Sequence, residues 1–541
     1  MFSYNTIFKC NSELLSRFLF FIFLFVVGIY SFDEYGVSFD EESYRDNALI
    51  DYNFIKNIFF NYGSINFRET FNEYFLKAGK FSSFFYIIVF FTNDLVKDYN
   101  NIDLYKIAHL LNFSIFILAC YCFFKIVLIR FKSKIYSYLA VLILFTTPRI
   151  FAESFFNNRD IYYLSINLIN LYFVQKIFLK LNFKNILIYS LISALCINMR
   201  LFGLINFFLV FIFLLLELEN KISIKKLIIN LILIFFLTIF FLILISPYYW
   251  LDPFTNFIKY YFTDFIITGN IRITNLFLGN LYSSQNTIWY YYIVWIFFTI
   301  PIFFLSLYIS GFFSKMIFFS QRLLKLIPNH NLWINKSEMF DLYITISLII
   351  FLFGVSRFSP VNLDGWRHVY FLYPLMVINI FYLLDLLIKK YRFLYFICLI
   401  FLSFNIIFNF YWIKKNHPYQ FVYFNSLNQI FTDKKFDLDY WGVTNYQAYK
   451  FVLNDSKFTK SSVGTVSYNN LLPNYSILKD DEKNLIYFNT PQENPDYLID
   501  NYRLGYKVFK TNKSLFLHNY KVVYEIIVNG NVISTVYKKK K

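Results

Sequence analysis

The stretch SRFLFFIFLFVVGIYSFDEYGVSFDEESYRD, residues 16–46, joins an apolar segment to a loop rich in acidic residues. Its first half, 16–31, is almost wholly apolar, as expected of a helix that crosses the hydrocarbon core of a bilayer. Asp40 and Glu41 follow in the second half. A helix needs no paired carboxylates to stay in lipid, so this pair belongs either to a functional site or to an ordinary solvated loop.

The composition of the whole chain indicates a polytopic membrane protein. Hydrophobic residues make up 58% of the 541 residues, charged residues make up 16%, and the mean hydropathy is +0.48. A soluble protein of this length would expose more charge. The formal net charge is +17, which in a soluble chain would suggest nucleic acid as a partner. Membrane topology explains much of that charge here, so we expect no nucleic-acid partner.

Apolar runs along the chain predict about eleven membrane spans. The first run lacks a small-residue cleavage site, so we expect it to be retained as a span. The shorter stretch 81–92 predicts an interfacial helix, with a re-entrant segment as the alternative. The predicted spans are 16–31, 104–129, 135–148, 161–179, 185–199, 201–217, 227–246, 288–310, 340–355, 368–388 and 393–413.

The distribution of charge predicts which loops face the cytoplasm. With a cytoplasmic N-terminus, every inner connection is basic, as the positive-inside rule requires. The outer loops instead hold mixed sets of acids and bases, which is typical of a site. We therefore expect a multi-pass protein of the cell (inner) membrane whose active site lies on the periplasmic or other extracytoplasmic side.

The chain is predicted to have two domains. Residues 1–413 form the membrane domain, with a long outer loop at about 32–103, and residues 414–541 form a small extracytoplasmic α/β domain. Strand-like runs occur at 461–467 and 521–537. The Asn529-Gly530 pair inside the second run predicts a hairpin turn.

The first two outer loops hold acids that could carry chemistry. A carboxylate at the membrane surface, such as Asp40 or Glu41, can act as a general base. Asp33 and Glu34 form a competing pair just before them. Asp160 opens a predicted helix in the second loop, where it could instead cap that helix.

Five basic residues on the same side could bind an anion. Arginine binds phosphate well through its planar fork, and a phosphate carried on a lipid would arrive at this depth. An unpaired guanidinium between apolar runs is costly, so Arg200 is expected to meet either a partner or an anionic ligand. We expect that Arg200 and Arg367 both meet a substrate anion and not a protein carboxylate. For Arg367 the alternative is an arginine that extends to the interface. The predicted substrate-binding residues are Arg149, Arg159, Arg200, Arg367 and His368.

Short motifs in a fixed order resemble a known family. The chain is similar to membrane glycosyltransferases of the GT-C class, and in particular to bacterial relatives of the dolichyl-phosphate-mannose protein mannosyltransferases (glycosyltransferase family 39). The resemblance covers nearly all of the membrane part. It rests on Phe39-Asp40-Glu41 with Tyr44, Pro148-Arg149, Asn158-Arg159-Asp160, Pro247 through Pro253, Trp366 through Tyr370, His417 through Gln420, and Tyr423-Phe424-Asn425.

The resemblance implies an inverting hexosyl- or pentosyltransferase on the outer face of the membrane. The donor would be a sugar linked to polyprenyl phosphate, and the acceptor a lipid, a glycan or a protein. Asp40 would be the catalytic base or would orient the acceptor, with Glu41 supporting it, and Asp160 would be the second catalytic acid. No cofactor is certain; a divalent cation held by Asp40 and Glu41 is left open. The second Phe-Asp-Glu at 32–34 is a departure from the family pattern.

Three other classes compete with this interpretation. A transporter or flippase of a lipid-linked saccharide would be expected to show internal symmetry and broken helices near the midplane, and the sequence shows neither clearly. An O-antigen polymerase or ligase also uses lipid-linked sugars, but it usually has its large loop late in the membrane region. A purely structural membrane protein would not need the clustered acids.

Overall fold

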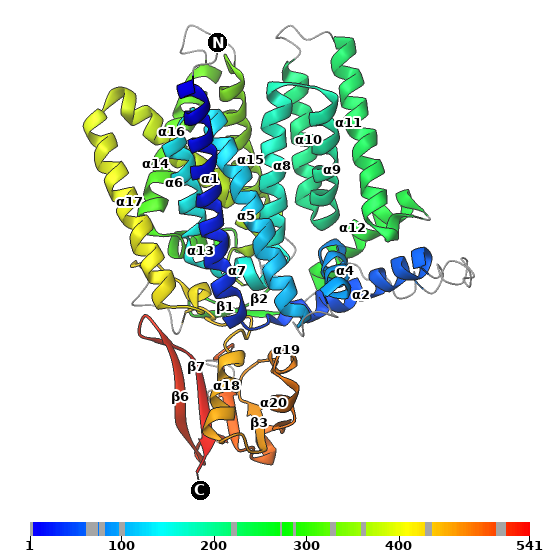
Figure 1. Ribbon diagram of the computed structural model, residues 1–541, viewed down its shortest axis with the longest axis vertical. Helices are drawn as coiled ribbons and strands as arrows, with labels where there is room; N and C mark the ends of the chain where they lie inside the picture. The colour runs from blue at the N-terminus through cyan, green and yellow to red at the C-terminus, as the bar shows by residue number, and fades with distance from the viewer. Residues whose placement is uncertain are drawn as a thin grey trace.

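The long helices of the chain stand side by side as a bundle, and a smaller domain lies at one end of it (Figure 1). The N-terminus lies at the opposite end. The structure is a computed structural model that describes residues 4–60, 74, 82–96, 103–217, 224–250, 252–270, 273–284, 288–324, 332–358, 364–427, 435–504 and 516–540.

The bundle contains both buried helices and helices at its surface. Helix α8 is buried over most of its surface, whereas α1, α11 and α17 expose large apolar side chains such as Phe18, Phe236 and Phe404. Such surfaces are typical of helices that face lipid. The bundle helices are α1 (Tyr4–Ser31), α5 (Leu104–Phe131), α6 (Lys134–Phe145), α7 (Pro148–Phe156), α8 (Asp160–Leu179), α9 (Phe183–Met199), α10 (Leu201–Leu216), α11 (Ile224–Ile245), α13 (Tyr291–Thr299), α14 (Ile302–Leu323), α15 (Lys336–Phe358), α16 (Tyr373–Lys390) and α17 (Arg392–Lys415).

Within the described residues, seven helices are long and apolar enough to cross a membrane. The number is eight if the pair α6 and α7, bent by 66°, counts as one span. The chain is thus a polytopic helical protein, but the predicted count of about eleven spans is not confirmed. The predicted runs 185–199 and 201–217 form α9 and α10, which meet at Arg200 and are short for a span, and Pro301 divides the predicted run 288–310 into α13 and α14. Proline lacks the N–H that would continue a helix.

Helices α2 (Phe39–Phe60), α4 (Phe84–Val96) and α12 (Pro253–Asn270) lie at the end of the bundle that faces the small domain (Figure 1). Helix α2 runs across the direction of the spanning helices. Helix α4 packs against α2 and α5, and whether it is interfacial or re-entrant stays a prediction. The hairpin β1 (Thr274–Phe277) and β2 (Asn280–Ser283) lies at the same end.

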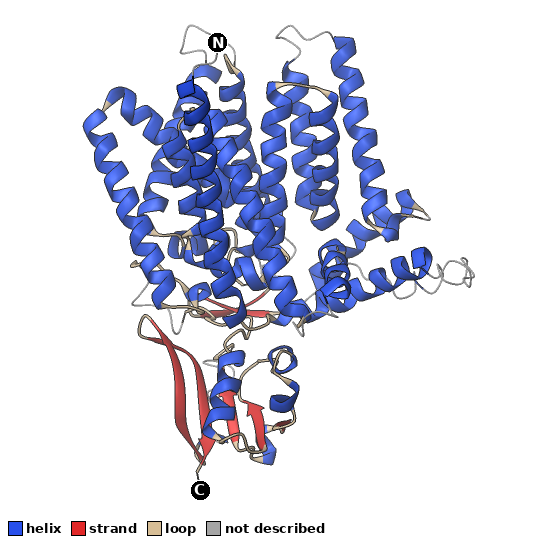
Figure 2. Cartoon of the chain, viewed as in Figure 1, coloured by secondary structure: helices blue, strands red, loops and turns tan. Residues whose placement is uncertain are grey.

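The C-terminal domain contains a five-stranded mixed sheet with short helices (Figure 2). The strand order is β4-β3-β5-β7-β6; β3 is parallel to β4 and β5, and β7 is antiparallel to β5 and β6. The predicted hairpin is confirmed, because Asn529 and Gly530 have φ values of 50° and 81°, as a type I′ turn requires. The elements are α18 (Asn445–Asp455), β3 (Ser461–Thr465), α19 (Leu472–Ser476), α20 (Asp480–Lys483), β4 (Ile486–Phe488), β5 (Tyr497–Asp500), β6 (Tyr520–Val528) and β7 (Asn531–Lys539).

A topology experiment follows from this arrangement. We expect a reporter that is active only outside the cytoplasm to be active when fused after residue 425, close to the C-terminal domain. The same reporter should be inactive when fused after Tyr391, between α16 and α17, at the end of the bundle where the N-terminus lies. The opposite pattern of the two fusions would contradict the predicted orientation.

Candidate functional site

Four charged side chains form a chain of ion pairs at the end of the bundle that faces the C-terminal domain. The Nη1 atom of Arg367 lies 3.0 Å from Asp40 Oδ2 and 3.5 Å from Asp160 Oδ2. Asp160 also pairs with Arg200, which lies at the break between α9 and α10. Arg367 opens the short helix η5 (Arg367–Leu372), while Asp40 and Asp160 lie at the starts of α2 and α8. The pairs therefore join four segments that are far apart in the sequence.

These contacts change the interpretation of two arginines. The expectation that Arg200 and Arg367 meet a substrate anion and no protein carboxylate is wrong, because both bind carboxylates of the protein. The reason is that the buried Asp160 also needs partners, and the fold brings it between the two guanidinium groups. Binding of substrate by either arginine stays a prediction.

Asp40 is the most accessible acid of this chain of ion pairs, with a side chain that is 21% exposed. Tyr44, one turn further along α2, directs its hydroxyl toward Asp40 Oδ2 at 3.5 Å. The same hydroxyl accepts a hydrogen bond of 3.2 Å from Arg159 Nη1. Among the described residues, none bonds to Oδ1 of Asp40, so that oxygen is available to accept a proton.

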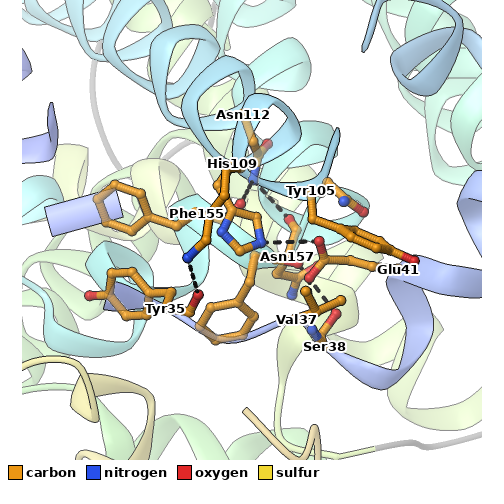
Figure 3. A network of polar contacts seen from close by, with 12 residues as sticks. Tyr35, Val37, Ser38, Glu41, Tyr105, His109, Asn112, Phe155 and Asn157 are labelled. Atoms are coloured by element: carbon orange, nitrogen blue, oxygen red, sulfur yellow. Dashed lines mark hydrogen bonds and ion pairs between the residues drawn. The ribbon is translucent and has the colours of Figure 1, made fainter. Parts of the chain in front are cut away.

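The carboxylate of Glu41 points toward His109 and Ser38 (Figure 3). Its Oε1 atom accepts a 2.8 Å hydrogen bond from the backbone N–H of Ser38, and its Oε2 lies 3.1 Å from His109 Nε2. Both Glu41 and His109 are fully buried. Glu41 therefore fixes the start of α2 against α5, and its carboxylate is not directed at a substrate.

A pattern in the sequence signals this division of roles. Ser38 and Glu41 have the Ser-x-x-Glu spacing of a capping box, in which the glutamate bonds back to the N-cap backbone N–H. The hydroxyl of Ser38 is used differently, since it donates to the carbonyl of Phe156 at 3.4 Å. The spacing assigns Glu41 to the helix start and gives Asp40 no such capping role.

Arg149 lies in a different setting from Arg200 and Arg367. Its guanidinium carbon lies 5.3 Å from the ring centre of Trp295 and 5.0 Å from that of Phe424. Its Nε donates to the carbonyl of Tyr423 at 3.0 Å. No carboxylate of the described part of the chain pairs with it, although its side chain is buried. Its other N–H groups are thus suited to an anionic ligand.

Glu153, which follows Arg149 in α7, and the predicted site residue His368 both have neutral partners. Glu153 accepts hydrogen bonds from the Tyr370 hydroxyl at 2.6 Å and from Asn157 at 2.7 Å, so its carboxylate is occupied. His368 Nδ1 lies 3.5 Å from the Tyr292 hydroxyl of α13. The imidazole of His368 follows Arg367 directly and extends the polar cluster toward α13.

Three arginines lie close enough to Asp364 to influence its ionisation. Burial raises the pKa of Asp364 to about 6, and the positive charges of Arg367, Arg149 and Arg503 oppose that rise. None of the three forms an ion pair with Asp364 within the part of the chain that the structure describes. Arg503 comes from the C-terminal domain and stacks on Tyr440, with 3.9 Å between its guanidinium carbon and the ring centre.

The competing acid pair lies elsewhere. Asp33 is 74% exposed and lies 3.5 Å from Lys106, while Glu34 lies 3.3 Å from His417. Neither acid pairs with an arginine of the ion-pair chain. The structure therefore brings together Asp40, Asp160, Arg200 and Arg367, with Arg159 linked through Tyr44, and places the earlier pair outside this cluster.

The donors at Asp40 and Glu41 do not fit a divalent cation. The Glu41 oxygens face Ser38 and His109, and Asp40 Oδ2 already faces the positive charge of Arg367. Hard cations prefer several converging oxygens. No group of three or more metal-ligating side chains is found among the described residues. No step of a reaction is therefore assigned to a metal here.

Sequence reasoning missed the contribution of the C-terminal domain to this cluster. The ring centre of Trp441 lies 4.2 Å from the guanidinium carbon of Arg367. The ring of Tyr440 lies near the guanidinium groups of both Arg367 and Arg503. Aromatic rings carry no local sequence signal for such a role in a chain that contains 24% aromatic residues. Only the fold brings these rings onto the arginines.

Comparison with protein-family models gives no match, and comparison with curated proteins gives no significant match.

The role of Glu41 leads to a stability prediction. Glu41→Ala removes the partner of His109 and of the Ser38 N–H, and both groups stay buried. We expect a loss of folding free energy on the order of 3 kcal/mol, seen as a lower melting temperature in detergent. Asp40→Ala should have a much smaller effect, because its partner Arg367 retains Asp160. Equal melting temperatures for the two variants would contradict the structural role of Glu41.

Proposed function

We propose that the chain is a glycosyltransferase that moves a sugar from a polyprenyl-phosphate donor to a hydroxyl or amine acceptor at the outer face of the membrane. One observation carries the proposal: a partly exposed carboxylate, Asp40, lies beside a cluster of arginines at the end of a helical membrane bundle. A lipid-linked phosphate reaches this depth from the bilayer, and an acceptor reaches it from the aqueous side.

Asp40 would act as the general base. Its unpaired Oδ1 takes the proton of the acceptor group, whose oxygen or nitrogen then attacks the anomeric carbon of the donor sugar. The bond between that carbon and the phosphate oxygen breaks in the same displacement, and the anomeric configuration inverts. The leaving phosphate keeps the electron pair of the broken bond. Arg367 holds the other carboxylate oxygen in place.

Arg149 is the residue best suited to the phosphate. It has no carboxylate partner among the described residues, and aromatic rings and one carbonyl hold its guanidinium. A fixed guanidinium stabilises charge that develops on a leaving group without reorganising during the reaction. Arg200 and Arg367 are already neutralised by carboxylates, so they contribute less net charge.

The alternative of a transporter or flippase has less support. Transporters place their substrate and ion sites near the midplane, at helices that are interrupted there. The ion pairs of Asp40 and Asp160 lie instead at one end of the bundle, beside α2 and the C-terminal domain. This position favours chemistry at a surface.

Matched substitutions of two aspartates test the proposal. Asp40→Asn keeps the shape of the side chain and removes the base, so we expect turnover to fall by about a hundredfold or more. Asp33→Asn, in the competing pair, should retain activity within a few-fold of wild type. Transfer from radiolabelled polyprenyl-phosphate sugars in membranes measures both, with protein level as the control. An essential Asp33 and a dispensable Asp40 would move the site to the earlier pair, and two silent substitutions would reject the proposal.

The raised pKa of Asp364 predicts a pH dependence of donor binding. With a pKa of about 6, this carboxyl group is neutral below that pH and negatively charged above it. The added negative charge beside Arg149 and Arg367 should weaken binding of a phosphodiester, whose own charge does not change in this range. We expect the donor KM to rise about fivefold between about pH 5 and about pH 7. Asp364→Asn should remove most of the dependence, and a KM profile unchanged by Asp364→Asn would contradict it.

A further inference from the structure

The loop immediately before Asp40, residues 35–38, is bound on two sides. On the bundle side, Lys106 Nζ donates to the carbonyl of Tyr35 at 3.1 Å, and Glu41 lies against His109. On the other side, residues of the C-terminal domain bind the backbone of the same loop. Figure 3 shows Tyr35, Val37 and Ser38 next to the Glu41–His109 pair.

Asn474, in α19 of the C-terminal domain, binds both backbone groups of Val37. Its Oδ1 accepts from the Val37 N–H at 2.8 Å, and its Nδ2 donates to the Val37 carbonyl at 2.9 Å. The same Nδ2 donates to the carbonyl of Gly442 at 2.9 Å. Val37 and Asn474 are both buried, so the backbone groups of Val37 would otherwise lack partners.

Two more contacts come from the same face of the domain. The backbone N–H of Phe39 donates to the carbonyl of Trp441 at 3.0 Å, and Gln447 Nε2 donates to the carbonyl of Glu34 at 2.6 Å. At Gly36 there is no room for a β-carbon, because Val443 and Asn474 approach the backbone closely. The domain thus contacts four residues of the loop immediately before Asp40.

The same domain segment also touches the ion partner of Asp40. Trp441 accepts the Phe39 N–H through its carbonyl, and its ring lies on the guanidinium of Arg367. A shift of this segment would therefore move the backbone beside Asp40 and the arginine that binds its carboxylate. A misplacement of about 1 Å can cost a catalytic group on the order of a hundredfold in rate.

We propose that the C-terminal domain sets the position of the catalytic carboxylate, and that Asn474 is the positioning residue through which it acts. Asn474 does not touch the substrate; it orders residues 35–39 so that Asp40 meets both Arg367 and the acceptor. This inference rests on the proposed function, and it assigns to the domain a role that its sequence does not suggest.

The test uses the full chain in detergent or nanodiscs and two independent measurements. Asn474→Ala removes both bonds to Val37, and Asn474→Asp keeps only the acceptor for the Val37 N–H. The control is Ser462→Ala, because the buried Ser462 also forms two side-chain hydrogen bonds, both to Asp496 and both inside the domain. Hydrogen exchange of the peptide that covers residues 35–41 reports the position of the loop, and transfer kinetics report its effect on the reaction.

We expect Asn474→Ala to speed exchange in residues 35–41 and to lower kcat by about tenfold or more, with the donor KM within about twofold of wild type. Asn474→Asp should protect the Val37 amide better than Asn474→Ala does, and Ser462→Ala should leave both exchange and kcat near wild type. Unchanged exchange in Asn474→Ala, or faster exchange with unchanged kcat, would overturn the inference. A wild-type chain without transfer activity would instead reject the proposed function, and the exchange measurement would still test the loop contact.

Discussion

The ion pairs of Arg367 with Asp40 and Asp160 are the constraint on which the end of the bundle depends. A guanidinium that is largely removed from water is stable only when carboxylates or aromatic rings surround it. Arg367 has both, because Asp40 and Asp160 lie on its Nη1 atom and Trp441 covers its face. The starts of α2, α8 and η5 and the loop before α18 must therefore meet at one place.

This constraint gives the two adjacent acids of the first loop different surroundings. Consecutive residues of a helix point in directions about 100° apart, so Asp40 and Glu41 cannot face the same partner. Glu41 turns inward to His109 and to the Ser38 N–H, and it fixes where the helix begins. Asp40 turns toward Arg367 and keeps partial access to solvent. Only the second setting suits a group that exchanges a proton with a substrate.

The sequence predicts the helical bundle, the C-terminal α/β domain and the hairpin at Asn529-Gly530, because hydropathy and turn chemistry are local properties. The predicted number of spans is not confirmed, since α9, α10 and α13 are short for a bilayer, although the division of α9 from α10 at Arg200 follows the predicted runs. The sequence does not predict the partners of the arginines. Arg367 and Asp40 are 327 residues apart, and nothing local in either segment signals the other.

The arginines of the site differ in net charge, and this decides what each could do for an anionic substrate. Arg367 and Arg200 pair with Asp40 and Asp160, so the net charge of the four groups together is close to zero. Arg149 and Arg503 have rings as neighbours and no carboxylate partner among the described residues. In the proposed function, attraction for a phosphate would come mainly from Arg149 and Arg503, while Arg367 binds the carboxylate of Asp40. Binding and proton transfer would then depend on different arginines. Three of these arginines, Arg367, Arg149 and Arg503, lie close enough to Asp364 to lower its pKa.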